Sequence, residues 1–520
     1  MLRHTVTRSS RSRPGYVLFA VLIVAVVLTL VAYQYAEAMT GQLQAAVRAH
    51  EIEQAKANAV SGVHWACSVL SDPNSIGTNF SDAADKFSAQ KVGDSSGGYG
   101  GGMFSIMNVA DTGDGTNTYT RRYGLSDESG KININALILL DPTGQLLHDT
   151  LMKLANMTED IADAIVDWVD ADSTTRPAGA EDDYYSGLSP AYRIKNGPLN
   201  SLEELLLIRD ITPDLLYGAD RNRNGVQDTN ETSDGSGFTR GWSEFLTCYG
   251  RELNTDSTGV QRINLNDTDV KKCSDALTAA VGQELSDYIM YFRFSGTSTT
   301  APATLPANQV AAPVSSLRDL VKSRVDGNFP SRRKISSVLT IVGTQIPLAR
   351  APNTPPNTPT QVVACPINDT ESLKKIVQVL LDKCTVSEDL ELTPSINVLT
   401  APKEVLAALP GLTDSDVTNL VSSRPAPGGT DDTAAWMLTQ ANLDVTKFRN
   451  IARFVTGRSG AYRVQSIGYF AQTNGPTARC EAVIEYVVST DANNVTQGRP
   501  RIVYFRELNE LGRGFNDLPR

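Results

Sequence analysis

The amino-terminal segment GYVLFAVLIVAVVLTLVAYQYA, residues 15–36, contains no charged side chain. An α-helix rises about 1.5 Å per residue, so about 20 apolar residues cross the hydrocarbon core of a bilayer, which is about 30 Å thick. The segment therefore predicts one transmembrane helix over residues 16–36. A cleaved secretory signal peptide is the alternative, but its apolar core would be shorter and would end at a small-residue cleavage site.

The charges on either side of this segment predict its orientation. Glu37 and a stretch of mixed charge follow it, whereas four arginines precede it: Arg3, Arg8, Arg11 and Arg13. Lys and Arg are enriched on the cytoplasmic side of membrane helices. We therefore expect residues 1–15 to be a cytoplasmic leader and the bulk of the chain to lie outside the cytoplasm, where calcium is available and disulfides persist.

Residues 37–72 continue the helical pattern beyond the membrane. Ala, Leu, Val and Ile recur at helical spacing, no proline interrupts them, and the stretch SDPN supplies a stop signal. The sequence predicts one helix of roughly fifty residues, half of it in lipid and half amphipathic.

Two distant groups of residues have the apolar alternation of strands, one within 90–135 and one within 461–510. We expect the second group to complete the sheet that the first begins. Residues 136–460 would then be a large, mostly α-helical domain inserted in the sheet, in an α+β fold whose long helix packs on an antiparallel sheet. A chain of 520 residues also exceeds the size of about 250 residues at which single cores stop growing.

The inserted segment repeats itself. LMKLANMTEDIADAIVDWV aligns with LAALPGLTDSDVTNLVSSR, and both patterns predict a helical hairpin. Asn156 and Gly411 would take the left-handed position that closes the first helix, and Thr158 and Thr413 would cap the second. Two stretches rich in Pro, Thr and Ala, TSTTAPATLPANQVAAPV and ARAPNTPPNTPTQ, are expected to be linkers without regular structure.

The stretch DRNRNGVQDTNE fits the calcium-loop template, with oxygen donors at alternating positions and a glycine at the sharp turn. It predicts a Ca²⁺ site formed by Asp220, Asn222, Asn224, Val226 through its carbonyl, Asp228 and Glu231. A polar surface turn is the alternative, because Asp, Asn and Gly are the usual turn residues. The Gly- and Ser-rich stretch that follows favours a static structural ion over a calcium sensor, which needs a moving helix.

A second acidic cluster occurs in DAIVDWVDAD and GAEDDYY. Asp163, Asp167 and Asp170 fall on one helical face, and more carboxylates follow after a turn. The candidate second metal site consists of Asp170, Asp172, Glu181 and Asp182. A solvated acidic face and a carboxylate pair for hydrolysis are the alternatives.

Other functional classes are disfavoured. The formal net charge of −11 is spread along the chain, which argues against nucleic-acid binding, because phosphates require clustered Lys and Arg. The second helices of the hairpins begin with acidic residues, which would repel a phosphate: Glu159 and Asp160 in one, Asp414 and Asp416 in the other. With four histidines and no Walker motif, we expect no enzymatic activity.

The six cysteines form no C-x-x-C pair, which disfavours a zinc site and favours disulfides. Six cysteines allow 15 pairings, and the sequence does not choose among them. The pairs that are simplest to propose are Cys365 with Cys384, Cys248 with Cys273, and Cys67 with Cys480.

Five stretches together resemble a known family. RPGYVLFAVLIVAVVLTL, LSDESGKININ, IADAIVDWVDAD, GAEDDYY and NSLEELLLI are similar to the minor pseudopilin K of the type II, or general, secretion pathway. The resemblance runs over nearly the whole chain, with residues 127–207 its most specific part. It implies a pseudopilin fold, a single-pass inner-membrane protein, and a place at the pseudopilus tip with the minor pseudopilins I and J, where it helps initiate pseudopilus assembly for protein export.

The resemblance also implies roles for three amino-terminal residues. A prepilin peptidase would cleave between Gly15 and Tyr16, and the new terminus would be methylated. Most pilins carry a glutamate at the fifth mature position, here Ala20, and the K subunit characteristically lacks it. An unpaired carboxylate in an apolar helix is costly, so its absence suits a subunit with no neighbour above it.

Two other functions remain open on the sequence. A type IV pilus minor pilin shares the membrane helix and differs mainly in its partners. A calcium-dependent, membrane-anchored binding protein would use the hairpins as DNA-uptake proteins do. Tyr16 in place of the more usual phenylalanine, and the long calcium-loop and linker region, depart from the resemblance.

Overall fold

A computed structural model gives the conformation of most of the chain. It describes residues 15–72, 80–93, 100–111, 119–220, 222–224, 231, 240–302, 304–348, 355, 358–425, 433–472, 475–490, 496–512 and 518–519. The fold is α+β, with one long amino-terminal helix, as the sequence predicts.

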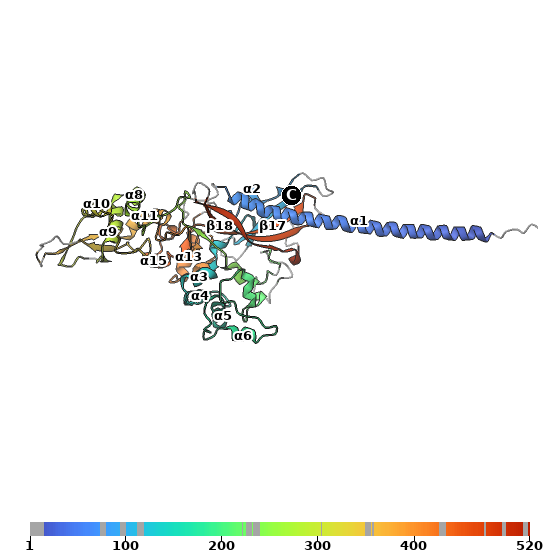
Figure 1. The fold of residues 1–520 in the computed structure, drawn as a ribbon, viewed down its shortest axis with the longest axis horizontal. Coiled ribbons are helices and arrows are strands. Elements are labelled where there is room, and N and C mark those ends of the chain that lie inside the picture. The colour runs from blue at the N-terminus through green and yellow to red at the C-terminus, as the bar shows by residue number, and fades with distance from the viewer. Residues whose placement is uncertain are drawn as a thin grey trace, which may run out of the picture.

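The helix α1 (Tyr16–Leu70) is one continuous element. Its first part projects away from the rest of the molecule, and its last turns lie along a sheet (Figure 1). Every side chain from Tyr16 to His50 is exposed, whereas small and apolar residues are buried near the end of the helix: Ala55, Ala59, Gly62, Val63, Ala66 and Leu70. The amphipathic second half therefore packs on the protein and the apolar first half stands free.

The main sheet joins two distant parts of the chain. Its central order is β1-β2-β17-β18-β19, with β3 paired to β2 and β4 paired to β17. All these pairs are antiparallel, and the strands that the sequence places in two separate groups do form one sheet. The strands are β1 (Gln90–Lys91), β2 (Gly102–Asp111), β3 (Tyr119–Tyr123), β4 (Ser126–Asp127), β17 (Ala461–Phe470), β18 (Ala478–Thr490) and β19 (Thr496–Glu507).

Gly468 on β17 allows α1 to approach the sheet. A Cβ atom at this position would lie 2.1 Å from the carbonyl oxygen of Ala55 and 2.3 Å from the amide nitrogen of Ala59. Both distances are shorter than van der Waals contact, so an added methyl group would push the helix off the strand.

We predict that Gly468→Ala lowers the free energy of unfolding by about 1–3 kcal/mol, the usual cost of overpacking a core. Denaturant unfolding of the purified chain in detergent measures it. Gly41→Ala is the matched control, because a Cβ atom there would meet nothing within 4 Å. Equal stability of the two variants would contradict the close approach.

The chain between β4 and β17 forms helices and short strands around one continuous apolar core. The short helix α2 (Ala84–Phe87) comes before this region. The helices within it are α3 (Ile134–Leu140), α4 (Gln145–Leu151), α5 (Glu159–Val169), α6 (Asp182–Ser186), α7 (Pro213–Tyr217), α8 (Val270–Val281), α9 (Gln283–Phe294), α10 (Arg318–Asp326), α11 (Thr370–Lys383), α12 (Lys403–Ala408), α13 (Asp414–Ser422), α14 (Trp436–Thr439) and α15 (Val445–Ile451). The 3₁₀ turns are η2 (Glu128–Gly130), η3 (Leu202–Leu207), η4 (Trp242–Glu244), η5 (Val314–Leu317) and, after β19, η6 (Asn509–Leu511).

Short strand pairs tie this region together. The pairs are β5 (Ile132–Asn133) with β6 (Leu246–Thr247), β7 (Glu252–Leu253) with β14 (Glu391–Leu392), β8 (Ile263–Asn264) with β13 (Cys384–Thr385), and β15 (Ile396–Asn397) with β16 (Val455–Thr456). Three of these pairs begin with an Ile-Asn dipeptide, which the sequence repeats at residues 132–133, 263–264 and 396–397, and all three pairs are parallel. The repeat in the sequence therefore marks the same kind of strand pair each time.

Residues 265–383, here called the distal lobe, contain α8–α11 and a second sheet with the order β10-β12-β11-β9. The lobe lies at the end of the molecule opposite the free part of α1 (Figure 1). Its strands are β9 (Thr299–Thr300), β10 (Gln309–Ala311), β11 (Thr344–Pro347) and β12 (Thr360–Ala364). The prediction that the two Pro-rich stretches lack regular structure is therefore wrong where they contribute strands, because tertiary pairing with β11 overrides their composition.

The two predicted hairpins are confirmed. They are α4 with α5 and α12 with α13, and Asn156 and Gly411 have φ values of 61° and 81°. The Thr158 and Thr413 hydroxyls each accept a hydrogen bond from a backbone N–H of the second helix. The local residues thus encode the turn, as the sequence predicts.

All six cysteines are free thiols in the structure. Cys67 of α1 and Cys480 of β18 both pack in the core between the helix and the sheet. Burial raises the pKa of the Cys480 thiol to about 12, so it behaves as an apolar side chain. The expected disulfides find no support in this structure.

Candidate functional sites

The predicted calcium loop is described at four of its six ligand positions; Val226 and Asp228 lie outside the described residues. The Asn224 amide donates to Asp220 Oδ1 at 3.0 Å and to Asn222 Oδ1 at 2.9 Å. The Asn222 amide donates to Glu231 Oε1 at 3.2 Å, so the first, third and last positions of the template meet. Asn224 and Glu231 are buried. A loop that only covered a surface would leave them in solvent.

Two residues of the main sheet hold this loop by its backbone. Arg479 of β18 donates to the carbonyl oxygens of Asn222 and Arg223, each at 3.0 Å, and Gln465 of β17 donates to that of Arg223 at 2.7 Å. Arg479 is fully buried, and this burial lowers the pKa of its guanidinium, while the negative charge of Asp220 opposes the shift. The sheet therefore fixes the loop at its third and fourth positions.

We predict that Arg479→Gln lowers the free energy of unfolding by about 1–3 kcal/mol, because the Asn222 carbonyl loses the Arg479 donor and the Arg223 carbonyl keeps only Gln465 of its two donors from the sheet. It should also weaken any calcium-dependent increase in melting temperature, since Gln465 is then the one sheet side chain that still holds the loop. Thermal unfolding with calcium and with chelator measures both effects. Arg501→Gln, at an exposed position of β19, is the matched control. Identical melting curves for the two variants would show that the anchor is dispensable.

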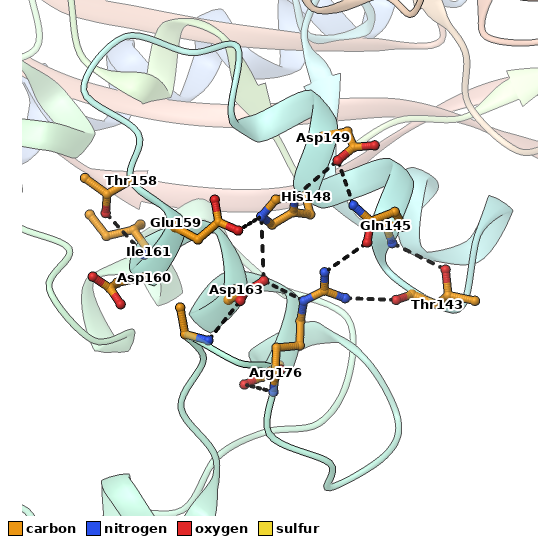
Figure 2. Close-up of polar contacts among 12 residues, drawn as sticks. Thr143, Gln145, His148, Asp149, Thr158, Glu159, Asp160, Ile161, Asp163 and Arg176 are labelled. Carbon is orange, nitrogen blue, oxygen red and sulfur yellow. Dashed lines mark hydrogen bonds and ion pairs between the residues drawn. The ribbon is translucent and has the colours of Figure 1, made fainter.

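The second acidic cluster is built around α5, where Asp163 and Asp167 are buried. Asp163 accepts from Arg176 Nε at 2.6 Å and from the Ala178 amide at 3.1 Å (Figure 2). Asp167 accepts from the Arg176 amide at 3.2 Å, and a Cβ atom on Gly179 would lie 1.9 Å from its Oδ2. These two carboxylates anchor the loop after α5 and do not form a solvated face.

His148 of α4 lies on the other side of Asp163 (Figure 2). Its Nε2 is 3.3 Å from Glu159 Oε1 and 3.7 Å from Asp163 Oδ1, and its Nδ1 is 3.2 Å from Asp149 Oδ1. The imidazole thus bridges the two helices of the first hairpin. Sequence reasoning missed this contact and the role of Arg176, because both depend on how a loop folds back over a helix.

Three carboxylate oxygens of the cluster accept no hydrogen bond of this kind. Asp170 Oδ1 and both carboxylate oxygens of Glu181 are buried without a hydrogen bond. Burial, reinforced by Asp172, raises the pKa of Asp170 to about 7, and burial raises that of Glu181. The other two predicted ligands are exposed: Asp172, whose Oδ1 accepts from the Thr174 amide at 2.7 Å, and Asp182 at the start of α6.

The chemistry of this donor set fits a hard cation. Orphaned, buried carboxylate oxygens are costly unless a positive charge compensates them, and Ca²⁺ takes several oxygen ligands in flexible geometry. Within the described residues, however, no three His, Cys, Asp or Glu side chains are already grouped tightly enough to hold a metal. The side chains would have to close around an ion to bring the orphaned oxygens into its coordination shell.

A third cluster lies where the chain leaves the main sheet. Glu128 of η2 is fully buried and accepts from Lys131 Nζ at 2.8 Å and from Arg463 Nε at 2.8 Å. Arg463 of β17 also donates to Glu481 Oε1 of β18 at 2.6 Å. This network joins the first turn of the inserted region to the centre of the sheet.

The membrane segment is the remaining site. Among the described residues, α1 is the one helix long and apolar enough to cross a bilayer, with a mean hydropathy of 2.8 in its most apolar part. The helix begins at Tyr16, directly after Gly15. Ala20 lies in the exposed apolar stretch from residue 16 to residue 36. This stretch contains no carboxylate side chain. The length and composition of α1 fit a single-pass membrane anchor.

Comparison with known proteins matches two segments of the chain to one family. Two sequence models, both described as type II secretion system (T2SS), protein K, match residues 130–218 and residues 396–456. The first match contains the first hairpin and the acidic cluster, and the second contains the second hairpin. Over these two segments the chain resembles the type II secretion system protein K family. Residues 219–395, which include the whole calcium loop and the whole distal lobe, lie between the two matches.

Two curated proteins named type II secretion system protein K are similar in sequence to short parts of this chain. The chain is 32% identical over 96 residues to the type II secretion system protein K of Pseudomonas aeruginosa, covering 17% of this chain and 29% of that protein. It is 37% identical over 71 residues to the protein K of Pectobacterium carotovorum, covering 14% of this chain and 22% of that protein. The matched segments thus span less than a third of these relatives.

One solved structure resembles the whole chain weakly. It is a chain of the GspK-GspI-GspJ complex from the type 2 secretion system of enterotoxigenic Escherichia coli, with 12% sequence identity and a TM-score of 0.38. The alignment covers 88% of this chain and 97% of that one.

Proposed function

We propose that this protein is the minor pseudopilin at the tip of a type II secretion pseudopilus, where it helps initiate assembly for protein export across the outer membrane. The observation that carries the proposal is the pair of protein K family matches, which cover both hairpins. The long apolar helix, packed by its second half on a sheet of distant strands, supports a pseudopilin fold with an inserted domain.

The geometry of α1 supports a role in a helical assembly in the inner membrane. Its exposed apolar half has no partner among the described residues, and lipid or the helices of other subunits would cover it. Ala20 leaves no carboxylate in this half to pair with a subunit above, which suits the tip. The partners proposed from the family resemblance are the minor pseudopilins I and J, the pseudopilus and the prepilin peptidase. The role is structural, without catalysis.

We further propose that Ca²⁺ binds the loop at residues 220–231 and the cluster at Asp170 and Glu181. Buried Asn224 and Glu231 and the orphaned oxygens of the cluster support it. When bound, the ion would supply positive charge and cross-link the chain around it. Because Arg479 and Gln465 hold the loop to the sheet, an ordered loop would also stiffen the junction between the sheet and the inserted region.

The alternatives have weaker support. Acidic residues begin α5 and α13, so these hairpins present carboxylates where a DNA phosphate would bind: Glu159, Asp160, Asp414 and Asp416. A type IV pilus minor pilin would share α1, but the family matches favour the secretion machinery.

Deletion and complementation test the function. Removal of the gene from its own bacterium should abolish export of proteins that use the type II pathway, and the wild-type chain should restore it. A chain lacking residues 1–36, which still contains all the described head, should not restore export. Normal export in the deletion strain, with a loss of surface pili, would replace the proposal by the pilus alternative.

A further inference from the structure

The distal lobe contains a local concentration of positive charge. In residues 318–334, Lys and Arg outnumber Asp and Glu by six to two, although the whole chain has a formal net charge of −11. We call the six side chains the basic face: Arg318, Lys322, Arg324, Arg332, Arg333 and Lys334. They belong to α10 and to the loop that follows it.

Three of these cations face solvent without a counter-ion. Lys322, Arg332 and Lys334 are exposed. Among the described residues, no carboxylate oxygen lies within 4 Å of their charged groups, although carboxylates outnumber cations in the chain. Arginines of the main sheet behave differently: Arg463, for example, is paired with both Glu128 and Glu481.

Aromatic rings hold two further cations. The Arg333 guanidinium lies 4.6 Å from the centre of the Phe292 ring, and that of Arg324 lies 5.8 Å from the centre of the Phe294 ring. Both rings belong to the last turn of α9, and the backbone of the basic loop is tied there too, because the Arg332 and Arg333 amides donate to the carbonyl of Arg293. Ring contacts fix a guanidinium in place and leave its charge uncompensated.

An apolar anchor lies in the same loop. The Phe329 side chain is 51% exposed, and its ring lies against Gly327, where a Cβ atom would come within 2.7 Å of it. Leu320, on α10, is 40% exposed. Large apolar side chains next to fixed cations are the composition of a protein-binding surface.

We propose that the basic face binds an acidic protein segment that also carries an apolar side chain for Phe329. Guanidinium groups offer planar paired donors that match carboxylates, and two of them are already held in place. Figure 1 shows α9 and α10 at the end of the molecule opposite the free part of α1, so lipids of the membrane that holds α1 are out of reach. The inference uses no metal and does not rest on the proposed function.

The test uses the purified full chain in detergent and a fluorescent glutamate-rich peptide with one central phenylalanine. The triple variant Lys322→Glu, Arg332→Glu, Lys334→Glu removes the free cations. Its matched control, Lys271→Glu, Lys272→Glu, Lys375→Glu, makes the same charge change at three other exposed lysines of the distal lobe. Fluorescence anisotropy gives the dissociation constants, and circular dichroism confirms that both variants are folded.

We expect the first variant to bind the peptide about tenfold more weakly than wild type, and the control to change affinity less than about twofold. Phe329→Ala should also weaken binding, and a peptide with glutamine in place of glutamate should not bind. Equal weakening by both triple variants would overturn the proposal, because it would show only long-range attraction. Binding of anionic lipid vesicles in place of the peptide would overturn it as well, in favour of a membrane surface.

Discussion

Replacing Arg463 with methionine is expected to lower the free energy of unfolding by about 3–5 kcal/mol, the cost of leaving buried charges unpaired. Arg463 is shared by Glu128 and Glu481, whose side chains are almost fully buried. Burial opposes the charge on Glu128, but Arg463 and Lys131 overcome this effect and hold the pKa of its carboxyl group well below the usual range. Without Arg463, Lys131 and Thr247 are the polar side chains left on Glu128.

The pH dependence of this variant follows from the sign of the shift. A carboxyl group with a lowered pKa in the folded state contributes stability above its unfolded pKa, near 4.5, and this stability is lost as pH falls through the folded value. The deficit of Arg463→Met should therefore be largest at pH 7 and shrink towards pH 3. Denaturant unfolding at both pH values measures it.

Two further variants test whether the loss of stability comes from unpaired buried charge. Arg501→Met removes an arginine from an exposed position of β19 and should leave stability within about 0.5 kcal/mol of wild type. Adding Glu128→Gln to Arg463→Met should recover part of the loss, because one buried charge disappears with its partner. A loss below about 1 kcal/mol in the single variant would mean that solvent reaches the network and that it does not hold the inserted region to the sheet.

The calcium-free protein is expected to become less stable as pH rises from 5 to 8. Burial raises the pKa of Asp170 to about 7 and that of Asp167 to about 6. A carboxyl group with a raised folded pKa contributes stability that is fully present below its unfolded pKa, near 3.8, and is lost as pH rises through the folded value. Melting temperatures in chelator should therefore fall over this range.

Calcium should reverse the loss at pH 8, since it binds the deprotonated carboxylates. At about 100 times its dissociation constant, the ion would add about 2.7 kcal/mol to the free energy of unfolding. Asp170→Asn should flatten the pH dependence in chelator and reduce the calcium effect. Asp220→Ala should reduce the calcium effect and leave the pH dependence in chelator unchanged, because Asp220 belongs to the loop and not to the cluster at Asp170.

The controls separate the ion from general charge effects. Asp275→Asn changes an exposed carboxylate of α8 and should alter neither the pH dependence nor the response to calcium. Magnesium demands stricter octahedral geometry and should stabilise less than calcium. Equal melting temperatures with calcium and chelator at pH 8 would remove the ion from the account and leave the cluster as a buried carboxylate pair.

The sequence predicts those parts of the fold that local pattern determines. The apolar run and its amphipathic continuation predict α1, and the left-handed Asn156 and Gly411 with their Thr caps predict the hairpins. Alternation predicts the strands on both sides of the inserted region. It does not predict the second sheet of the distal lobe, because β10 and β12 have Pro-rich neighbours and form only by pairing across the lobe.

The sequence indicated which residue types form the candidate sites, but not how their side chains are arranged in space. The carboxylates in and after α5 were evident in the sequence. Which of them accept hydrogen bonds depends on where the loop after α5 places its amides: Asp163 and Asp167 accept them, whereas Asp170 Oδ1 and the Glu181 oxygens do not. The partners of Arg479 are distant in the chain, and no pattern in the sequence connects that residue to the loop at Asn222. The charges of the basic face are visible in the sequence, whereas their lack of counter-ions is a property of the fold.

The account as a whole depends on this chain being a processed pseudopilin, and the mass of its amino-terminal peptide tests that most directly. The protein would be purified from its own membranes and the peptide identified by mass spectrometry. We predict a peptide that starts at Tyr16, where α1 begins, with the additional mass of one methyl group. A peptide that still starts at Met1 would contradict the account and would make the chain an ordinary membrane-anchored protein.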